Sequence, residues 1–164
     1  MIPQYELKAE DIRAYTLNLL KDHTPLDITG YICTTEVILD VILKASAESS
    51  SIEAASNDLK GGADSNTIRE YLNAVLDIKE LRQQENEMNA ALAECIPDSL
   101  PRTQLEVAID FHDEPFYGKQ AQWCAVTCSG QAKKGTTHFI RIASAYVIWR
   151  QVRLTIALRY VLPA

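Results

Sequence analysis

The stretch L-E-V-A-I-D-F-H-D-E-P-F-Y-G, residues 105 to 118, decides the interpretation of the second half of the chain. Every second residue from Leu105 to Phe111 is apolar, and this period of two predicts a β-strand. Proline cannot donate to a strand ladder and glycine favours turns, so Pro115 and Gly118 predict that the strand ends near His112. Asp110 would then lie at the carboxyl end of the strand, where a carboxylate can begin a metal site.

Composition predicts a folded chain with two unlike halves. The 164 residues are 47% hydrophobic, which suits one ordinary domain or two small ones and argues against disorder. The net charge of −6 is unevenly spread, since residues 1–100 hold 8 basic against 18 acidic residues and residues 101–164 hold 8 against 4. No acidic residue follows Glu114. The last part of the chain therefore carries a positive field. This field could attract phosphates, or the basic residues could simply belong to a solvent-exposed face of a sheet.

Cysteines and hydropathy exclude several classes of protein. The four cysteines form no C-x-x-C pair and the three histidines lack zinc-finger spacing, so a structural zinc site is not indicated. Residues 1–20 are interrupted by charged and polar side chains, unlike a signal peptide, and no apolar run reaches the roughly 20 residues of a membrane helix. We expect a soluble cytoplasmic protein with free thiols and no membrane partner.

Four helices are expected in the first part of the chain. Helical spacing of apolar residues and capping residues predict them over residues 9–22, from Thr34 or Thr35 to the serines at 49–51, over residues 51–59, and from Asp64 or Ser65 to residue 76. Ser50 and Glu53 have the spacing of a capping box. The first helix should bury Ile12, Tyr15, Leu19 and Leu20, and the fourth Ile68, Tyr71, Leu72, Val75 and Leu76. The last three helices, with a glycine turn before the fourth, predict a helix-turn-helix.

A connector helix is expected over residues 77–96. Its apolar positions approximate a heptad seam that Glu85 interrupts, and they are Ile78, Leu81, Met88, Leu92 and Cys95. Fewer than three heptads make a weak coiled coil, so a homodimer through this segment stays an open alternative. Pro97 and Pro101 mark a boundary, which predicts a helical domain over residues 1–97 and a second unit over residues 102–164.

The second unit is expected to be a three-stranded antiparallel sheet, so the fold class is α+β. Residues 136–148 are rich in β-branched and aromatic types, and residues 152–162 alternate so that Val152 and Tyr160 should share a face. The short connection between these two strands predicts a hairpin. Together with the strand that carries Asp110 they form the sheet, and no helix is expected over either of its faces.

The fourth helix carries the candidate DNA-binding residues. Polar side chains on it and in the turn before it could read base edges and phosphates, and they are Lys60, Asn66, Thr67, Arg69 and Asn73. The charge of −10 over residues 1–100, to which Glu70 contributes, opposes this interpretation. A DNA-reading helix-turn-helix and a helical bundle that packs on a protein partner both stay open.

Three segments together resemble the beginning of the catalytic domain of insertion-sequence DDE transposases. They are D-F-H-D-E-P-F-Y-G at 110–118, K-K-G-T-T-H-F at 133–139 and V-R-L-T-I-A-L-R-Y-V at 152–161. The resemblance implies a ribonuclease-H-like core, DNA transposon ends as the partner and Mg²⁺ as the cofactor. Its first strand would carry the first metal-binding and catalytic aspartate, a position that Asp110 matches.

The resemblance spans residues 102–164 and a helical region of the same general type. The second aspartate and the glutamate of the family triad have no counterpart after Glu114, so we expect a truncated transposase fragment that does not cleave DNA alone. One alternative is a non-catalytic DNA-binding module or transposition regulator, in which Asp110 is a solvated or turn-capping residue. Another is a helical interaction protein with no nucleic-acid role.

Overall fold

The computed structural model describes residues 8–59, 62–100, 104–119 and 124–163. Five α-helices come first and an antiparallel sheet follows, so the described chain is α+β as expected. Contacts divide the chain into two compact units between Leu81 and Arg82. The boundary expected from the prolines at 97 and 101 therefore falls inside the second unit, because the helix before Pro97 packs on the sheet.

The first unit contains four α-helices and a short 3-10 turn. Their bounds are α1 (Ala9–His23), α2 (Thr35–Glu48), α3 (Ile52–Asp58), α4 (Ser65–Val75) and η1 (Ile78–Glu80). The Thr34 side chain caps α2, and the Asp64 side chain caps α4 by accepting the backbone N–H groups of Asn66 and Thr67. Residue 49 ends α2 in the left-handed region at φ 51°. The four expected helices are therefore present, and each begins within one residue of its expected start.

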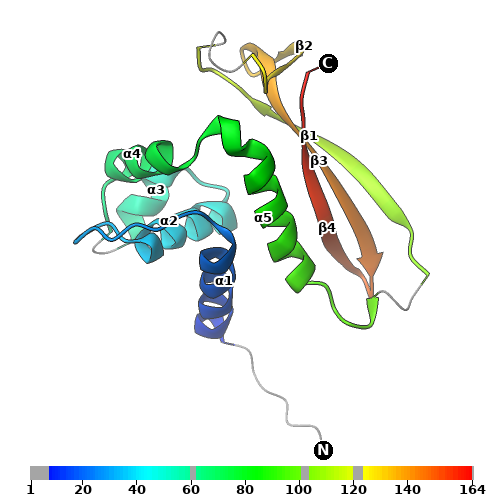
Figure 1. The fold of residues 1–164 in the computed structure, drawn as a ribbon, viewed down its shortest axis with the longest axis horizontal. Helices are drawn as coiled ribbons and strands as arrows, with labels where there is room; N and C mark the ends of the chain where they lie inside the picture. The colour runs from blue at the N-terminus through cyan, green and yellow to red at the C-terminus, as the bar shows by residue number, and fades with distance from the viewer. Residues whose placement is uncertain (1–7, 60–61, 101–103, 120–123, 164) are drawn as a thin grey trace, which may run out of the picture. The chain divides into compact units, whose positions relative to one another are not determined.

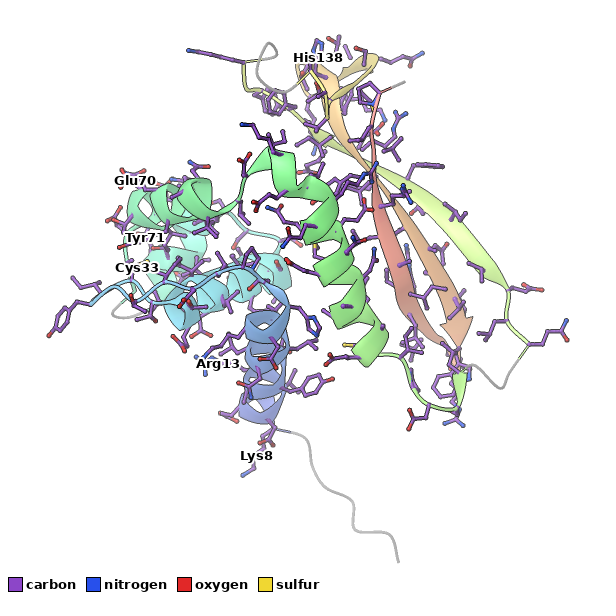
Figure 2. The ribbon with its side chains drawn as sticks, viewed as in Figure 1. Lys8, Arg13, Cys33, Glu70, Tyr71 and His138 are labelled. Carbon is purple, nitrogen blue, oxygen red and sulfur yellow. The ribbon has the colours of Figure 1, made fainter. Side chains whose placement is uncertain are left out.

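The core of the first unit is built on α2. Its Ile38, Leu39 and Val41 are at most 2% exposed, and Ile68 of α4 is completely buried against the same cluster. Buried Thr35 ties the loop before α2 to this core, because its hydroxyl donates to the Leu26 carbonyl and accepts the N–H of residue 28, both at 2.9 Å. Figure 2 shows Cys33 and Tyr71 in this unit, and a Cβ on Gly30 would lie 2.4 Å from the Cys33 carbonyl oxygen. The turn therefore requires glycine there.

Three details of the helical prediction were wrong. Leu76, expected to be buried by the fourth helix, lies one residue beyond α4 and is 45% exposed. Ile12 and Tyr15 of α1 are more than half exposed and Leu17 is buried instead, whereas Leu20 packs against the core as expected. The exposed side of α1 still contacts α2 through charge, because Arg13 forms a bidentate ion pair with Asp40 (Figure 2). The N-cap of α3 is Ser51, whose hydroxyl accepts the N–H of residue 54 at 3.1 Å, so the expected capping box one residue earlier does not form.

The second unit holds α5 (Leu81–Glu94) and four antiparallel strands. The strands are β1 (Val107–Pro115), β2 (Cys128–Lys133), β3 (Thr136–Trp149) and β4 (Val152–Val161). Long β3 is central, with β1 on one side, while β2 and β4 pair with different parts of it on the other (Figure 1). The three-strand expectation was wrong because β2 is an additional strand between the first and second expected ones.

Both hairpins of the sheet use two-residue turns with positive φ. Lys134 and Gly135 connect β2 to β3 with φ of 50° and 81°, and Arg150 and Gln151 connect β3 to β4 with φ of 49° and 66°. Positive φ at both positions is the requirement of a type I′ turn, which matches the right-handed twist of paired strands. The expected hairpin between the last two strands is therefore confirmed.

The alternation expected along β4 is broken by a bulge. Ala145 pairs with Ala157 but Tyr146 pairs with Thr155, so one extra residue on β4 shifts its register. Because residues opposite one another share a face, Val152 lies on the face of β3 residue 149, while Tyr160 lies on the other face with residue 142. The expectation that Val152 and Tyr160 share a face was wrong for this reason.

Helix α5 lies along the outer edge of β4 and binds its backbone (Figure 1). The Asn89 amide nitrogen donates to the Leu158 carbonyl at 2.9 Å, and its oxygen accepts the Leu158 N–H at 2.8 Å. Glu85 accepts the Tyr160 N–H at 2.7 Å, and Arg82 donates to the Tyr160 carbonyl at 3.1 Å. These backbone groups point away from β3, so the three side chains take the place of a neighbouring strand.

This contact overturns the heptad interpretation of the connector. Met88 is 41% exposed and Cys95 is exposed, whereas Glu85, which interrupts the seam, is 5% exposed. The helix buries a polar row because it faces the unpaired edge of a strand, which needs donors and acceptors. Among the described helices, none combines the length and apolar character needed to cross a bilayer.

Candidate functional site

Asp110 lies in the middle of β1 and is exposed. It is the fourth residue of a nine-residue strand, with Ser144 of β3 opposite. The expected end near His112 was wrong because Pro115 fits the strand. The Phe116 N–H donates to the His138 carbonyl at 2.9 Å, so by alternation the Pro115 nitrogen points to the outer edge, where no ladder bond is lost.

The sheet has two faces that differ in character around Asp110. The face that bears Asp110, called here the Asp110 face, also carries Ser144, Tyr146 and Arg153. The opposite face, called the Phe111 face, carries Phe111 and buried Val147. Because alternate residues of a strand point to opposite faces, the register assigns every candidate side chain to one of the two.

The two acids that follow Asp110 are held in separate arrangements. Asp113 lies on the Phe111 face, where Arg141 donates to both its oxygens at 2.6 and 3.1 Å and Lys133 approaches to 3.8 Å. The hydrogen bonds from Arg141 hold the pKa of Asp113 below its ordinary value. Glu114 shares the Asp110 face but contacts His112 at 2.8 Å, and four residues of strand separate it from Asp110 by about 13 Å.

The acids nearest Asp110 in sequence do not form a shared metal site with it. Mg²⁺ is bound through carboxylates, often one or two with waters or phosphates completing an octahedron. Asp110 instead lies beside a positive charge, since Nη2 of Arg153 is 3.8 Å from its carboxylate. Within the described ranges, no group of three or more His, Cys, Asp or Glu side chains is arranged to hold a metal. Asp110 thus contributes one carboxylate, and the acids nearest in sequence do not add to it.

The two motif segments around residues 110–118 and 133–139 form one structural cluster. The Tyr117 hydroxyl donates to the Lys134 carbonyl at 2.7 Å, and the Thr136 hydroxyl donates to the Phe116 carbonyl at 2.8 Å. His138 supplies the carbonyl that accepts the Phe116 N–H and is labelled in Figure 2. These hydrogen bonds join the turn of β2 and β3 to the end of β1, so the two motif segments belong to one local structure.

The structure brings most of the candidate DNA-binding residues onto α4. Asn66, Arg69 and Asn73 follow the i, i+3, i+7 spacing of one helix face, and both asparagines are exposed. Arg69 reaches back along this face to donate to the Ser65 hydroxyl at 3.1 Å and the Asn66 carbonyl oxygen at 3.4 Å. Lys60 lies outside the described residues.

Thr67 has a structural role at the start of the same helix. Its hydroxyl donates to the Asp64 carboxylate at 2.7 Å, and its N–H donates to the same carboxylate at 3.2 Å. These bonds lower the pKa of Asp64 and complete its cap. The Thr67 hydroxyl is thus engaged within the helix, while Glu70 is exposed on α4 (Figure 2).

Sequence reasoning missed the neighbours of Asp110 on β3 and β4. Arg153 was counted as one of several basic residues, and Tyr146 as part of a strand. The signal that could have found them is the two-residue turn, because pairing residue 149 with residue 152 places Arg153 opposite Ile148 and beside Tyr146. Comparison of the chain with protein-family models, curated proteins and solved structures finds no match.

Proposed function

We propose that this chain is a DNA-binding protein related to the front part of insertion-sequence DDE transposases. The observation that carries the proposal is the exposed Asp110 in the middle of β1, the first strand of the sheet. The chain that follows β1 is hydrogen-bonded to the turn of β2 and β3, so the two motif segments meet there. In the enzymes that the sequence resembles, the first strand of a ribonuclease-H-like core carries the first aspartate of the triad. The second unit is proposed to correspond to that part of the core.

The first unit is proposed to recognise DNA through α4. Support comes from the exposed face of Asn66, Arg69 and Asn73, since asparagine and arginine are the side chains that read adenine and guanine edges. The short contacts of Arg69 within the helix orient its guanidinium without an acidic partner among the described ion pairs. This role makes the chain a binding module for transposon ends.

Binding by α4 can be tested with a charge-matched pair of variants. Arg69→Ala should weaken binding of duplexes selected from a random pool by about tenfold or more, because a lost base contact costs about 1–3 kcal/mol. Lys79→Ala removes one exposed positive charge elsewhere in the first unit and should change affinity less than about threefold. Equal effects of the two variants, measured by fluorescence anisotropy across a salt series, would remove the recognition role.

The same chain is expected to bind DNA without cutting it. Asp110 is the sole member of the family triad in the sequence given, and its nearest acids face elsewhere or are paired. Purified protein with Mg²⁺ should therefore leave supercoiled plasmid intact. Nicking that disappears in Asp110→Ala would contradict this and show a complete catalytic site.

A helical interaction protein without a nucleic-acid role is the second candidate. The charge of −10 over residues 1–100 favours it, because that charge repels phosphates. It predicts no duplex binding at low salt by the wild-type chain. The anisotropy measurement therefore separates the two candidates before any variant is made.

A further inference from the structure

A groove opens at the end of the sheet near the turn of β3 and β4, and residues of both faces line it. It is an open groove of about 610 Å³, lined from the Asp110 face by Ala108, Tyr146 and Ile148 and from the Phe111 face by Val107 and Trp149. Glu106 and Arg150 line it as well. A volume of several hundred cubic ångströms is typical of small-ligand sites, and this one mixes aromatic, aliphatic and charged side chains.

Arg153 is held beside this groove by stacking. Its guanidinium carbon lies 3.7 Å from the centre of the Tyr146 ring, and its Nη2 lies 3.8 Å from the Asp110 carboxylate. The Arg153 and Asp110 side chains are 52% and 61% exposed, so their ion pair is weak. The ring therefore fixes the plane of the guanidinium, and because the side chain is half exposed, the other face of that plane is open to a stacking partner.

A second arginine on an aromatic ring stands at the mouth of the groove. Arg150 lies 4.3 Å from the centre of the Trp149 ring, in the positive-φ turn, and it is exposed. Among the described ion pairs, Arg150 takes part in none. Two acidic residues lie near the groove, Glu106 just before β1 and Asp110 on it. The positive charge of the groove comes from Arg150 in the turn of β3 and β4.

We infer that this groove binds an unpaired nucleotide of DNA, with the base stacked on the Arg153 guanidinium opposite Tyr146 and a backbone phosphate on Arg150. Arginine planes and aromatic rings stack on bases whose faces are exposed, which a paired duplex does not offer. The inference rests on the proposed function for DNA as the partner. It adds a second DNA site, on the sheet and next to Asp110, that is independent of α4.

The test is binding of a fluorescein-labelled oligothymidylate by the full chain. Arg153→Gln should weaken binding about tenfold because the base loses its stacking plane. Arg150→Gln should reduce the dependence of log affinity on log salt by about 0.7, the loss of one phosphate contact on a single strand. Arg153→Lys keeps the charge and loses the planar stack, so it should weaken binding several-fold with an unchanged salt dependence. Circular dichroism should show the same fold in all variants because the side chain is exposed.

Arg159→Gln is the matched control. Arg159 is exposed on the same strand but pairs with Ala143 and lies on the Phe111 face, so it loses the same charge away from the groove. We expect a change of less than about twofold in affinity, since a distant exposed charge is screened by salt. Equal losses for Arg153→Gln and Arg159→Gln would show a general basic field and overturn the inference.

The outcomes separate this inference from the proposed function. Duplex binding that depends on Arg69, together with absent or Arg153-independent oligothymidylate binding, contradicts the groove alone. Oligothymidylate binding that depends on Arg153, without Arg69-dependent duplex binding, contradicts recognition by α4 and supports the groove. Absence of binding to both probes contradicts both.

Discussion

The two outer edges of the sheet are treated in opposite ways. At the β4 edge, Arg82, Glu85 and Asn89 of α5 bind the backbone of Leu158 and Tyr160. At the β1 edge, no strand among the described residues pairs with the outward-facing backbone groups. A free strand edge can pair with a strand of another chain. The β4 edge is protected from such pairing by α5, and the β1 edge is open to it.

The side chains at the two edges match this difference. Glu85 is 5% exposed and the β4 residues beside it are half-buried, so a polar helix face replaces a strand. Burial, with the nearby Glu85 carboxylate as a second cause, raises the pKa of Tyr160. On β1, Val107, Ile109 and Phe111 are 56–68% exposed and form an apolar row beside the open backbone. The open edge is thus both unpaired and apolar.

Removal of the protecting carboxylate should have the largest effect. Glu85→Ala leaves the Tyr160 N–H and the Arg82 guanidinium without their acceptor, so the free energy of unfolding should fall by about 2–3 kcal/mol. Urea denaturation measures this fall, and amide hydrogen exchange should show faster exchange at Leu158 and Tyr160. The matched control is Glu87→Ala, which loses one exposed bond from Gln83 and should cost less than about 0.5 kcal/mol. Equal costs would mean that α5 does not protect the edge.

The β4 edge also shows where sequence reasoning could not succeed. Glu85 was interpreted as an interruption because apolar periodicity assigns buried positions to apolar residues, and a helix that binds a strand edge buries polar ones. Helix existence, by contrast, followed from local signals such as Thr34 and Asp64, which act on neighbours two or three residues away.

The candidate site was predictable in part for a similar reason. The exposed position of Asp110 on a strand followed from period-two spacing, but its neighbours depend on pairing across more than 30 residues. The bulge between residues 145 and 146 changes which β4 side chains reach the Asp110 face, and no local pattern announces it. The turn of β3 and β4 places Arg153 beside Tyr146, but only the long-range pairing of β1 with β3 brings Asp110 next to both.

Among the described strands, β1 pairs with β3 alone. The ion pair between Asp113 of β1 and Arg141 of β3 should therefore contribute to stability. Asp113→Asn loses the bidentate contact with Arg141 and should cost about 1 kcal/mol at neutral pH. Because folding lowers the pKa of Asp113, its stabilisation is fully present above the unfolded pKa of about 3.9 and is lost as the pH falls through the folded value.

The difference in unfolding free energy between wild type and Asp113→Asn should therefore shrink below about pH 4. Urea titrations at a series of pH values measure it. Glu114→Gln serves as the control, since its contact with His112 is exposed on both sides and should change stability by less than about 0.5 kcal/mol. A difference that persists unchanged into strong acid would mean that the charge of Asp113 contributes nothing to the pairing of β1 with β3.

Substitution on the open edge itself should have the smallest effect on stability and a clear effect on association. Ile109 is 68% exposed, so Ile109→Lys should change the free energy of unfolding by less than about 0.5 kcal/mol. A lysine beside an open edge opposes pairing with another chain, because its charge must be desolvated or repelled, so self-association should begin at a higher protein concentration. Sedimentation velocity across a concentration series measures this.

Ile148→Lys is the comparison, since Ile148 is 71% exposed but lies on the central strand, paired there with Arg153 of β4. If both lysines suppress association equally, general surface hydrophobicity is the cause. If Ile109→Lys alone does so, association runs through the open β1 edge, the counterpart of the β4 edge that α5 covers.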